Sequence, residues 1–347
     1  MLILAIETSC DETSSSIVRD GVEVLSNIIH SQDELHVEYG GVVPEIASRA
    51  HTERMIPVLE ESLTRAGCAW SDIDAIAVAN RPGLIGSLLV GVTSAKGLAC
   101  ALGLPLIGVD HIEAHLYAGC LESTPPPFPA LGLVVSGGHT SLFACTNTTT
   151  MEQIGSTIDD AVGEAYDKAA VLLGLDYPGG PRLDAMAREG DDSTHEFPVS
   201  MLDRGSLDFS FSGLKTSVLY TVRGTPERVD GKTVFPRDGS ELSEREKRDI
   251  AAGFQKAAVD ALMSRMKRAI EQAEYKSILV GGGVSANSLL RERLSEFAER
   301  HGLELRLPGL RYCLDNAAMI AGYAFHLFQA GRVDDLALSA MPTSARR

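Results

Sequence analysis

The sequence predicts an α/β protein built from two related lobes with a cleft between them. Three observations lead to this prediction. Short apolar runs typical of buried strands alternate with segments of helical periodicity. The order hairpin, helix, strand, helix occurs twice along the chain, as a repeat of architecture rather than of sequence. The length of 347 residues is too great for one small core and fits two lobes of ordinary size.

The first repeat covers residues 2–102. LILAIET (2–8) predicts a buried strand, and Asp20-Gly21 between apolar runs predicts a hairpin. The segment GGVVPEIASRAH (40–51) leads into helical periodicity that continues to about residue 66. DAIAVA (74–79) predicts a strand. A helix is expected at 84–102, where apolar residues recur with helical spacing: Leu84, Leu88, Val92, Ala95 and Ala99.

The second repeat begins at residue 130. ALGLVVSGGHTSLFAC (130–145) predicts two strands joined by a Gly-Gly turn, and a helix is expected at 157–173, ending at Gly174. SILVGGG (277–283) predicts a strand that runs into a glycine loop, followed by a helix that ends near Gly302. A last helix is expected at about 316–330. Residues 222–247 are polar and charged, which predicts a surface insertion.

Composition and charge exclude several classes of protein. We find no apolar run that approaches the roughly 18 residues needed to span a bilayer, and no basic leader before Glu7. The six cysteines include no CxxC pair, which predicts reduced thiols in a cytoplasmic protein. A net charge of −16 opposes nucleic-acid binding unless the surface is locally basic or a partner subunit supplies charge. Basic clusters occur at 245–248, 264–268, 291–293 and the C-terminus, and solvated helix faces also explain them.

The segment DHIEAHLYAG (110–119) places two histidines four residues apart. On a helix, His111 and His115 would lie on one face and could bind one metal ion. The zinc-protease pattern HExxH needs a glutamate directly after the first histidine, where this chain has Ile112. Ala114 also excludes the inverted pattern HxxEH, and Glu113 would point elsewhere. The segment therefore predicts a metal-binding pair without the protease's general base, although the spacing alone also fits an incidental pair.

A site for one metal ion needs at least one further ligand, usually a carboxylate for iron or catalytic zinc. Asp315, in CLDNAAMIAG, is a candidate at the start of the last expected helix. An aspartate there is also a common helix N-cap, and the residues alone leave both interpretations open.

Three turns with small residues follow predicted strands. ETSCDETS (7–14) surrounds Asp11 and Glu12, SGGHT (136–140) predicts a tight turn whose N–H groups could face a phosphate, and GGGVSAN (281–287) is a strand-to-helix glycine loop. None matches the GxGxxG or P-loop pattern. Hairpin turns and helix caps explain each turn alone. The three together favour a nucleotide in the cleft.

The expected helix at 157–173 has an apolar face and an acidic face. Asp160, Glu164 and Asp167 line the acidic face, which solvent exposure and a Glu164–Lys168 pair would also explain. LDYPGGPRLD (175–184) then predicts a rigid turn that holds Asp184. A carboxylate held in this way suits a ribose hydroxyl, although turn chemistry alone accounts for it too.

Taken together, these motifs resemble the TsaD family, the bacterial transferases that make N6-threonylcarbamoyladenosine in tRNA. The resemblance covers residues 2–325 and is carried by IETSCDET, GGVVPEIASRAH, HIEAH, LVVSGGHT, DDAVGEAYDKAAVLLGLDYPGGP, FSFSGLKT, GGGVSAN and LDNAAMIAG, in that order. It implies the actin, Hsp70 and sugar-kinase (ASKHA) fold. The expected domains are an N-terminal lobe (1–109), a C-terminal lobe (110–324) and a helix and tail (325–347) packed on the N-terminal lobe. The segment 222–247 looks longer than the family usually has.

The resemblance also implies the site. One divalent metal, Fe²⁺ ahead of Zn²⁺, would be bound by His111, His115 and Asp315. Asp11 and Glu12 match acidic positions near the phosphate end of the cleft, and either could take a proton. The substrate contacts of the family fall on Val134, Val135, Ser136, Gly137, Gly138, Asp167, Gly180, Asp184 and Asn287.

The implied reaction transfers the threonylcarbamoyl group from threonylcarbamoyl-AMP to N6 of adenosine 37, in tRNAs that read codons beginning with A. The implied protein partners are a TsaB-like paralogue and a TsaE-like ATPase, and no membrane is involved. Three alternatives stay open on the residues alone. They are a sugar-kinase-like phosphotransferase, a nucleotide-dependent regulator for which His111 would be dispensable, and a metalloprotease, which Ile112 disfavours.

Overall fold

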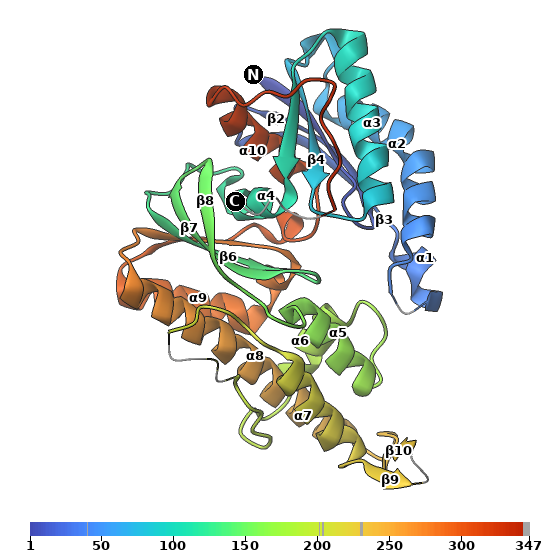
Figure 1. Ribbon diagram of the computed structural model, residues 1–347, viewed down its shortest axis with the longest axis vertical. Coiled ribbons are helices and arrows are strands. Elements are labelled where there is room, and N and C mark those ends of the chain that lie inside the picture. Colours follow the sequence, from blue (N-terminus) through green and yellow to red (C-terminus); the bar gives the residue numbers. More distant parts are fainter. Residues whose placement is uncertain (40, 201, 203–204, 230–231, 343–347) are drawn as a thin grey trace.

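The computed structural model describes residues 1–39, 41–200, 202, 205–229 and 232–342. Within them lie two five-stranded mixed sheets with the same architecture (Figure 1). The strand orders are β3-β2-β1-β4-β5 and β8-β7-β6-β11-β12. In each sheet the first two pairings are antiparallel and the last two are parallel. The repeat predicted from the sequence is therefore confirmed.

The elements have the following bounds. The first sheet contains β1 (Leu2–Glu7), β2 (Glu12–Arg19), β3 (Glu23–Ser31), β4 (Ala75–Arg81) and β5 (Leu106–Asp110). The second contains β6 (Ala130–Val135), β7 (Thr140–Asn147), β8 (Thr150–Ser156), β11 (Ser277–Gly281) and β12 (Glu304–Arg306). A small hairpin is formed by β9 (Glu227–Val229) and β10 (Lys232–Val234). The helices are α1 (Asp33–His36), α2 (Pro44–Ala66), α3 (Ile85–Leu102), α4 (His111–Tyr117), α5 (Val162–Leu172), α6 (Gly179–Ala187), α7 (Ser212–Arg223), α8 (Glu244–Gln272), α9 (Ser288–His301) and α10 (Ala317–Gln329).

The local signals used in the prediction act as expected at several boundaries. Asp20 and Gly21 both have positive φ, which is the backbone geometry of a tight hairpin between β2 and β3. Gly302 has φ +65° and ends α9 in the left-handed conformation that glycine adopts without strain. The segment 40–51 leads into α2, although Gly40 lies outside the described residues.

Helices α4 and α10 lie between the two sheets and join them. The aromatic and aliphatic side chains of α10 pack against β1, β2 and α4, and the same buried cluster includes Val134 of β6 and Leu279 of β11. Because this cluster takes side chains from both sheets, any residue at the start of α4 or α10 has a position set by both lobes. The domain boundaries after residues 109 and 324 stay predictions.

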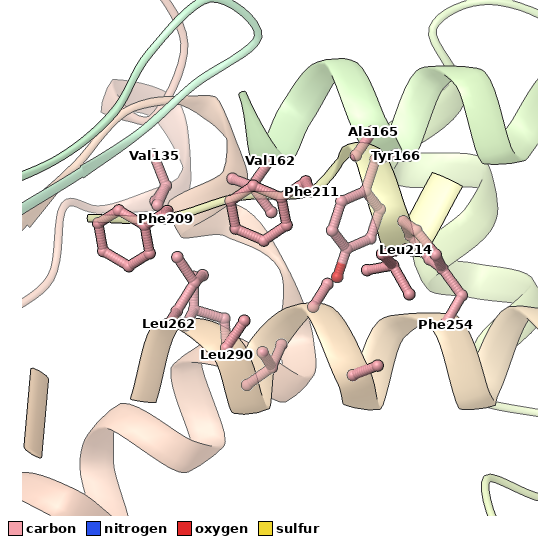
Figure 2. Close-up of a cluster of buried hydrophobic side chains, with 14 of the residues drawn as sticks. Val135, Val162, Ala165, Tyr166, Phe209, Phe211, Leu214, Phe254, Leu262 and Leu290 are labelled. Atoms are coloured by element: carbon pink, nitrogen blue, oxygen red, sulfur yellow. The ribbon is translucent and has the colours of Figure 1, made fainter. Parts of the chain in front are cut away.

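A second core lies beneath the other face of the second sheet. Figure 2 shows Val135 of β6 beside Val162 of α5, together with Phe209 and Phe211. Helix α8 closes this core with Phe254 and other buried side chains. This packing holds α5 and the end of β6 against the long helix α8, and so gives the Gly-Gly turn after β6 a rigid base.

The structure corrects the expected helix at 157–173. Helix α5 begins only at Val162, and Ile158, within the predicted helix, is 63% exposed. The preceding residues are used elsewhere. Thr157 N donates to Thr140 O, and Asp159 accepts hydrogen bonds from Phe211 N and Ser212 N at the start of α7. The helical periodicity of the sequence therefore begins five residues before the helix itself, because long-range hydrogen bonds compete for residues 157–161.

Two other expectations also change. Helix α3, with mean hydropathy 1.6 over its 18 residues, is long and apolar enough by composition to cross a membrane, contrary to the prediction that no such run exists. Its Leu88, Val92, Ala95 and Ala99 face inward, and the helix packs on β4 and α2 as a core helix does. The segment 222–247 contains the β9–β10 hairpin at the far end of the second lobe (Figure 1), but its last four residues already form the first turn of α8.

Candidate metal centre and substrate site

Two histidines and one aspartate meet where α4 and α10 begin. His111 and His115 lie one turn apart on α4, and Asp315 precedes α10. Their Nε2 atoms face the Asp315 oxygen Oδ1 at 3.5 Å and 3.1 Å. One ligand atom from each of the three side chains lies within 4.8 Å of the others. These distances allow one metal ion to bind all three ligands, as the sequence predicts.

The unpartnered nitrogen atoms of His115 fit a metal at this place. The His115 side chain is fully buried, and among the described residues neither ring nitrogen has a hydrogen-bond partner. Its Nε2 points at Asp315 without the geometry of a hydrogen bond. A buried polar atom left unpaired costs about 1–3 kcal/mol. A metal ion between His115 and Asp315 would satisfy Nε2, so the residues present fit such a group.

Glu7, at the end of β1, sets the tautomer of His111. Glu7 is fully buried, and its Oε2 accepts a hydrogen bond from His111 Nδ1 at 2.9 Å. Because a carboxylate can only accept, Nδ1 carries a proton, and Nε2 is the nitrogen that could offer its lone pair to a metal. Carboxylates that bind histidine ligands in this way orient them and raise their basicity. Glu7 is therefore part of the site, although the sequence prediction did not include it.

The electrostatics of the group favour a cation. Burial opposes a charge on His111, but the nearby carboxylates of Glu7 and Asp315 outweigh it and raise the pKa of His111 well above its usual value. Burial likewise opposes ionisation of Asp315, yet His111 and His115 hold its pKa well below the usual range. Glu7 at Nδ1 and Asp315 at Nε2 thus stabilise positive charge at His111 from both sides of its ring, and a divalent ion beside Nε2 would supply that charge while both histidines stay neutral.

The structure excludes the N-cap interpretation of Asp315. Asn316 is the N-cap of α10, because its side-chain oxygen accepts a hydrogen bond from Met319 N at 3.1 Å. The neighbouring Asp315 is therefore free to face the histidines. Glu113, as expected, points away from them and accepts a hydrogen bond from Tyr323.

The Gly-Gly turn after β6 lies beside the metal group. Gly137 and Gly138 are exposed in this turn, and Ser136 O accepts a hydrogen bond from Gly163 N near the start of α5. Burial, followed by the influence of His111 and His115, lowers the pKa of His139 to about 4, so this side chain is neutral at pH 7. His139 belongs to the SGGHT motif but was not among the predicted site residues.

Val134 and Val135 present only their backbone to this turn. Both side chains are fully buried, and they belong to the two different cores on either side of β6 (Figure 2 shows Val135). Strand alternation explains this, because neighbouring side chains of a strand point to opposite faces. Any contact of these two residues with substrate must therefore use main-chain N–H or C=O groups.

The remaining predicted contacts form two hydrogen-bonded pairs of elements. Asp167 on α5 accepts from Gly179 N and Gly180 N at 3.0 Å and 3.3 Å, and so caps the start of α6. Asp184 on α6 accepts from Asn287 Nδ2 at 3.1 Å, next to the start of α9. The segment 175–184 is thus not a rigid turn as expected, because α6 begins within it at Gly179. The cap that Asp167 supplies is a long-range contact.

Asp11 lies in the loop that joins β1 to β2, and Glu12 is the first residue of β2. Both carboxylates influence Tyr177: burial, and then Asp11 and Asp167, raise the pKa of Tyr177. Burial and the neighbouring Asp315 and Asp11 also raise the pKa of Glu12 well above its ordinary value. The loop lies beside the metal group, because its Ser9 hydroxyl is 3.2 Å from His111 Nδ1. A raised carboxyl pKa suits a general base that works near neutral pH.

The basic clusters at 245–248 behave as solvated helix faces. Lys247 pairs with Glu244, Arg248 with Glu189, and Arg245 approaches Asp249 at 3.9 Å. The basic residues at the extreme C-terminus, 345–347, lie outside the described residues.

Comparison with known proteins agrees with this geometry. A family model described as "TsaD: tRNA N6-adenosine threonylcarbamoyltransferase" matches residues 23–322. A tRNA N6-adenosine threonylcarbamoyltransferase of Trichlorobacter lovleyi is 48% identical over 99% of this chain and 96% of its own length. The Bacillus subtilis enzyme of the same name is 47% identical over 95% of this chain and 92% of its own.

Solved structures show the fold. HypF from T. kodakarensis superposes with a TM-score of 0.60 at 16% identity, over 97% of this chain and 49% of that one. Component A of the (R)-2-hydroxyglutaryl-CoA dehydratase of Acidaminococcus fermentans gives 0.52 at 16% identity, over 94% and 97%. The two-lobed ASKHA fold predicted from the sequence is therefore confirmed.

Proposed function

Because the chain belongs to the TsaD family and forms threonylcarbamoyladenosine in tRNA, we propose that His111, His115 and Asp315 hold the divalent metal this transfer uses. The observation that carries the proposal is the buried, unpartnered Nε2 of His115 opposite Asp315. The two histidines and one carboxylate leave coordination positions open and are a donor set that non-haem Fe²⁺ often takes, which supports iron ahead of zinc.

The transfer joins the carbamoyl carbon of threonylcarbamoyl-AMP to N6 of adenosine 37 in tRNA, and AMP leaves. When bound, the metal supplies a Lewis acid and a fixed point for donor oxygens. The Gly137–Gly138 turn offers main-chain N–H groups to the phosphate, with Ser136 held by Gly163. Asp184 of α6 and Asn287 at the start of α9, which are hydrogen-bonded to each other, would bind the nucleoside.

The amine of adenosine loses one proton as the new C–N bond forms. Asp11 or Glu12 takes that proton in our proposal, since they follow the β1–β2 loop, whose Ser9 hydroxyl lies 3.2 Å from Nδ1 of the metal ligand His111. The proton then leaves to solvent.

The setting of the enzyme is also a proposal. All six cysteines are free thiols, which supports a cytoplasmic location. With a net charge of −16, the chain would bind tRNA together with partner subunits that supply positive surface. A TsaB-like paralogue and a TsaE-like ATPase are the partners we propose.

Nucleoside mass spectrometry of digested tRNA tests the metal assignment. Cells depleted of this protein would be rescued with wild type, His111→Ala, Asp315→Ala or the exposed control His30→Ala. We expect wild type and His30→Ala to restore threonylcarbamoyladenosine, and the two ligand variants to fail. Full activity of Asp315→Ala would show that the transfer does not depend on a metal held by Asp315.

A further inference from the structure

A chain of buried polar side chains runs through the first lobe, apart from the metal ligands. Gln32, His36 and His51 are all fully buried. They come from the end of β3, from α1 and from α2. His51 is the last residue of the motif GGVVPEIASRAH, and no step of the proposed reaction uses it.

The hydrogen bonds of His51 determine its tautomer. His51 Nε2 lies 2.9 Å from the Cys10 carbonyl oxygen, which can only accept. Nε2 must therefore carry the proton. In the neutral ring Nδ1 is then an acceptor, and it faces Thr13 Oγ1 at 2.8 Å and Gln32 Nε2 at 3.3 Å. Both of these atoms can donate, so every contact of the ring is satisfied.

Gln32 extends the same order of donors and acceptors from His51 to His36. Its NH₂ group donates to His51, so its Oε1 is left as an acceptor, and His36 Nε2 lies 3.4 Å from it. His36 Nε2 must then carry a proton, and its Nδ1 accepts from Val43 N at 3.3 Å. All donors in the chain point the same way, from Val43 through His36, Gln32 and His51 to the Cys10 carbonyl.

The hydrogen-bonded chain ends at Cys10 in the β1–β2 loop, directly before Asp11 and Glu12. The loop is held from two other sides. Ser9 O accepts from Leu84 N at 2.8 Å, and Ser9 N donates to Glu7 at 2.5 Å, next to His111. The Cys10 carbonyl, which binds His51, directly precedes Asp11, whereas Glu12 is paired with Ser31 in the ladder between β2 and β3. Losing the bond to Cys10 would therefore free Asp11 at the end of the loop.

We propose that His51 is a positioning residue of the transferase, whose Nε2–H tautomer, enforced by Gln32 and His36, fixes Asp11, next to Glu12 at the start of β2, beside the metal group through the Cys10 carbonyl. The activity part of this proposal rests on the proposed role of the acidic pair, whereas the tautomer does not. Burial lowers the pKa of His51, in agreement with a neutral ring. A proton on Nδ1 would face the NH₂ group of Gln32 and force that amide, and then His36, to rearrange.

Two substitutions of His51 test its Nε2–H donor separately from the rest of the ring. His51→Gln can place an NH₂ group near the position of Nε2 and keep the bond to Cys10. His51→Asn reaches only the position of Nδ1 and loses that bond. The exposed His30 of β3 supplies the control His30→Asn. We expect His51→Asn to lower kcat for threonylcarbamoyladenosine formation by about 100-fold, the scale of a 1 Å misplacement of a reacting group. His51→Gln should stay within about tenfold of wild type, with the KM for tRNA and the Zn²⁺ content unchanged in both.

Nitrogen-15 NMR of histidine-labelled, Zn²⁺-loaded wild type measures the tautomer directly. We expect a protonated Nε2 and an unprotonated Nδ1 for His51 at neutral pH. The opposite tautomer, or equal kcat losses in the Gln and Asn variants, would overturn the proposal. If His51→Asn does not fold, the tautomer and the activity of His51→Gln decide. If instead the tautomer is confirmed but alanine variants of Asp11 and Glu12 stay active, only the proposed proton acceptor fails.

Discussion

The substitution Glu7→Gln tests whether a carboxylate behind His111 supports the metal site. The Glu7 carboxylate accepts two buried hydrogen bonds, from Ser9 N at 2.5 Å and from His111 Nδ1 at 2.9 Å. A glutamine of the same shape has one acceptor oxygen and one NH₂ group. One of the two buried donors would then face another donor, whichever way the amide turns.

Two magnitudes follow from this geometry. An unpaired buried donor lowers the free energy of unfolding by about 1–3 kcal/mol. Loss of the partner that orients a histidine ligand lowers metal affinity by about 10–100-fold. We therefore expect Glu7→Gln to unfold at lower urea concentration than wild type, and to bind Zn²⁺ about 10–100-fold more weakly in a chelator competition. Glu45→Gln, on the exposed first turn of α2, should change neither quantity.

Zn²⁺ affinity and stability in urea can each contradict the expected role of Glu7. Unchanged Zn²⁺ affinity in Glu7→Gln would show that the contact between Glu7 and His111 does not support metal binding. Unchanged affinity together with unchanged stability would also contradict the hydrogen-bond assignment around Ser9. A loss of stability without a loss of Zn²⁺ affinity would show that Glu7 supports only the fold at the end of β1.

Three further predictions concern the scaffold. A Cβ on Gly281 would collide with the His115 carbonyl, so Gly281→Ala should weaken Zn²⁺ binding and cost about 1–3 kcal/mol of stability in urea unfolding; normal binding would contradict the packing. Gly97→Ala, in an exposed and open position of α3, should instead stabilise the protein by about 0.5–1 kcal/mol in the same assay. Asp159→Asn should destabilise the start of α7 by about 1 kcal/mol at pH 7, because hydrogen bonds from Ser210, Phe211 and Ser212 outweigh burial and lower the pKa of Asp159. A depressed carboxyl pKa gives stability that is complete above the unfolded pKa of about 3.9 and is lost as pH falls through the lower folded value, so the difference between wild type and variant in unfolding curves should shrink as the pH falls below about 3.9.

Much of the fold was predictable because its signals are local. Alternating apolar runs, the Asp20-Gly21 turn and the glycine after α9 depend on neighbouring residues, and each appears where the sequence places it. The predicted start of α5 was wrong because its true start depends on contacts with distant residues. Thr157 and Asp159 make their hydrogen bonds with β7 and α7, and no periodicity near residue 160 reports such partners.

The sequence by itself determined the two repeated lobes, the pairing of His111 with His115 on one helical face and, through resemblance, Asp315 as their partner. Only the tertiary structure decided that Asn316 rather than Asp315 caps α10, that Glu7 orients His111, and that His51 binds the Cys10 carbonyl. The physical reason is that a buried polar atom must find a partner wherever packing brings one. Such partners come from strands and helices far apart in the chain, so residue spacing carries no record of them.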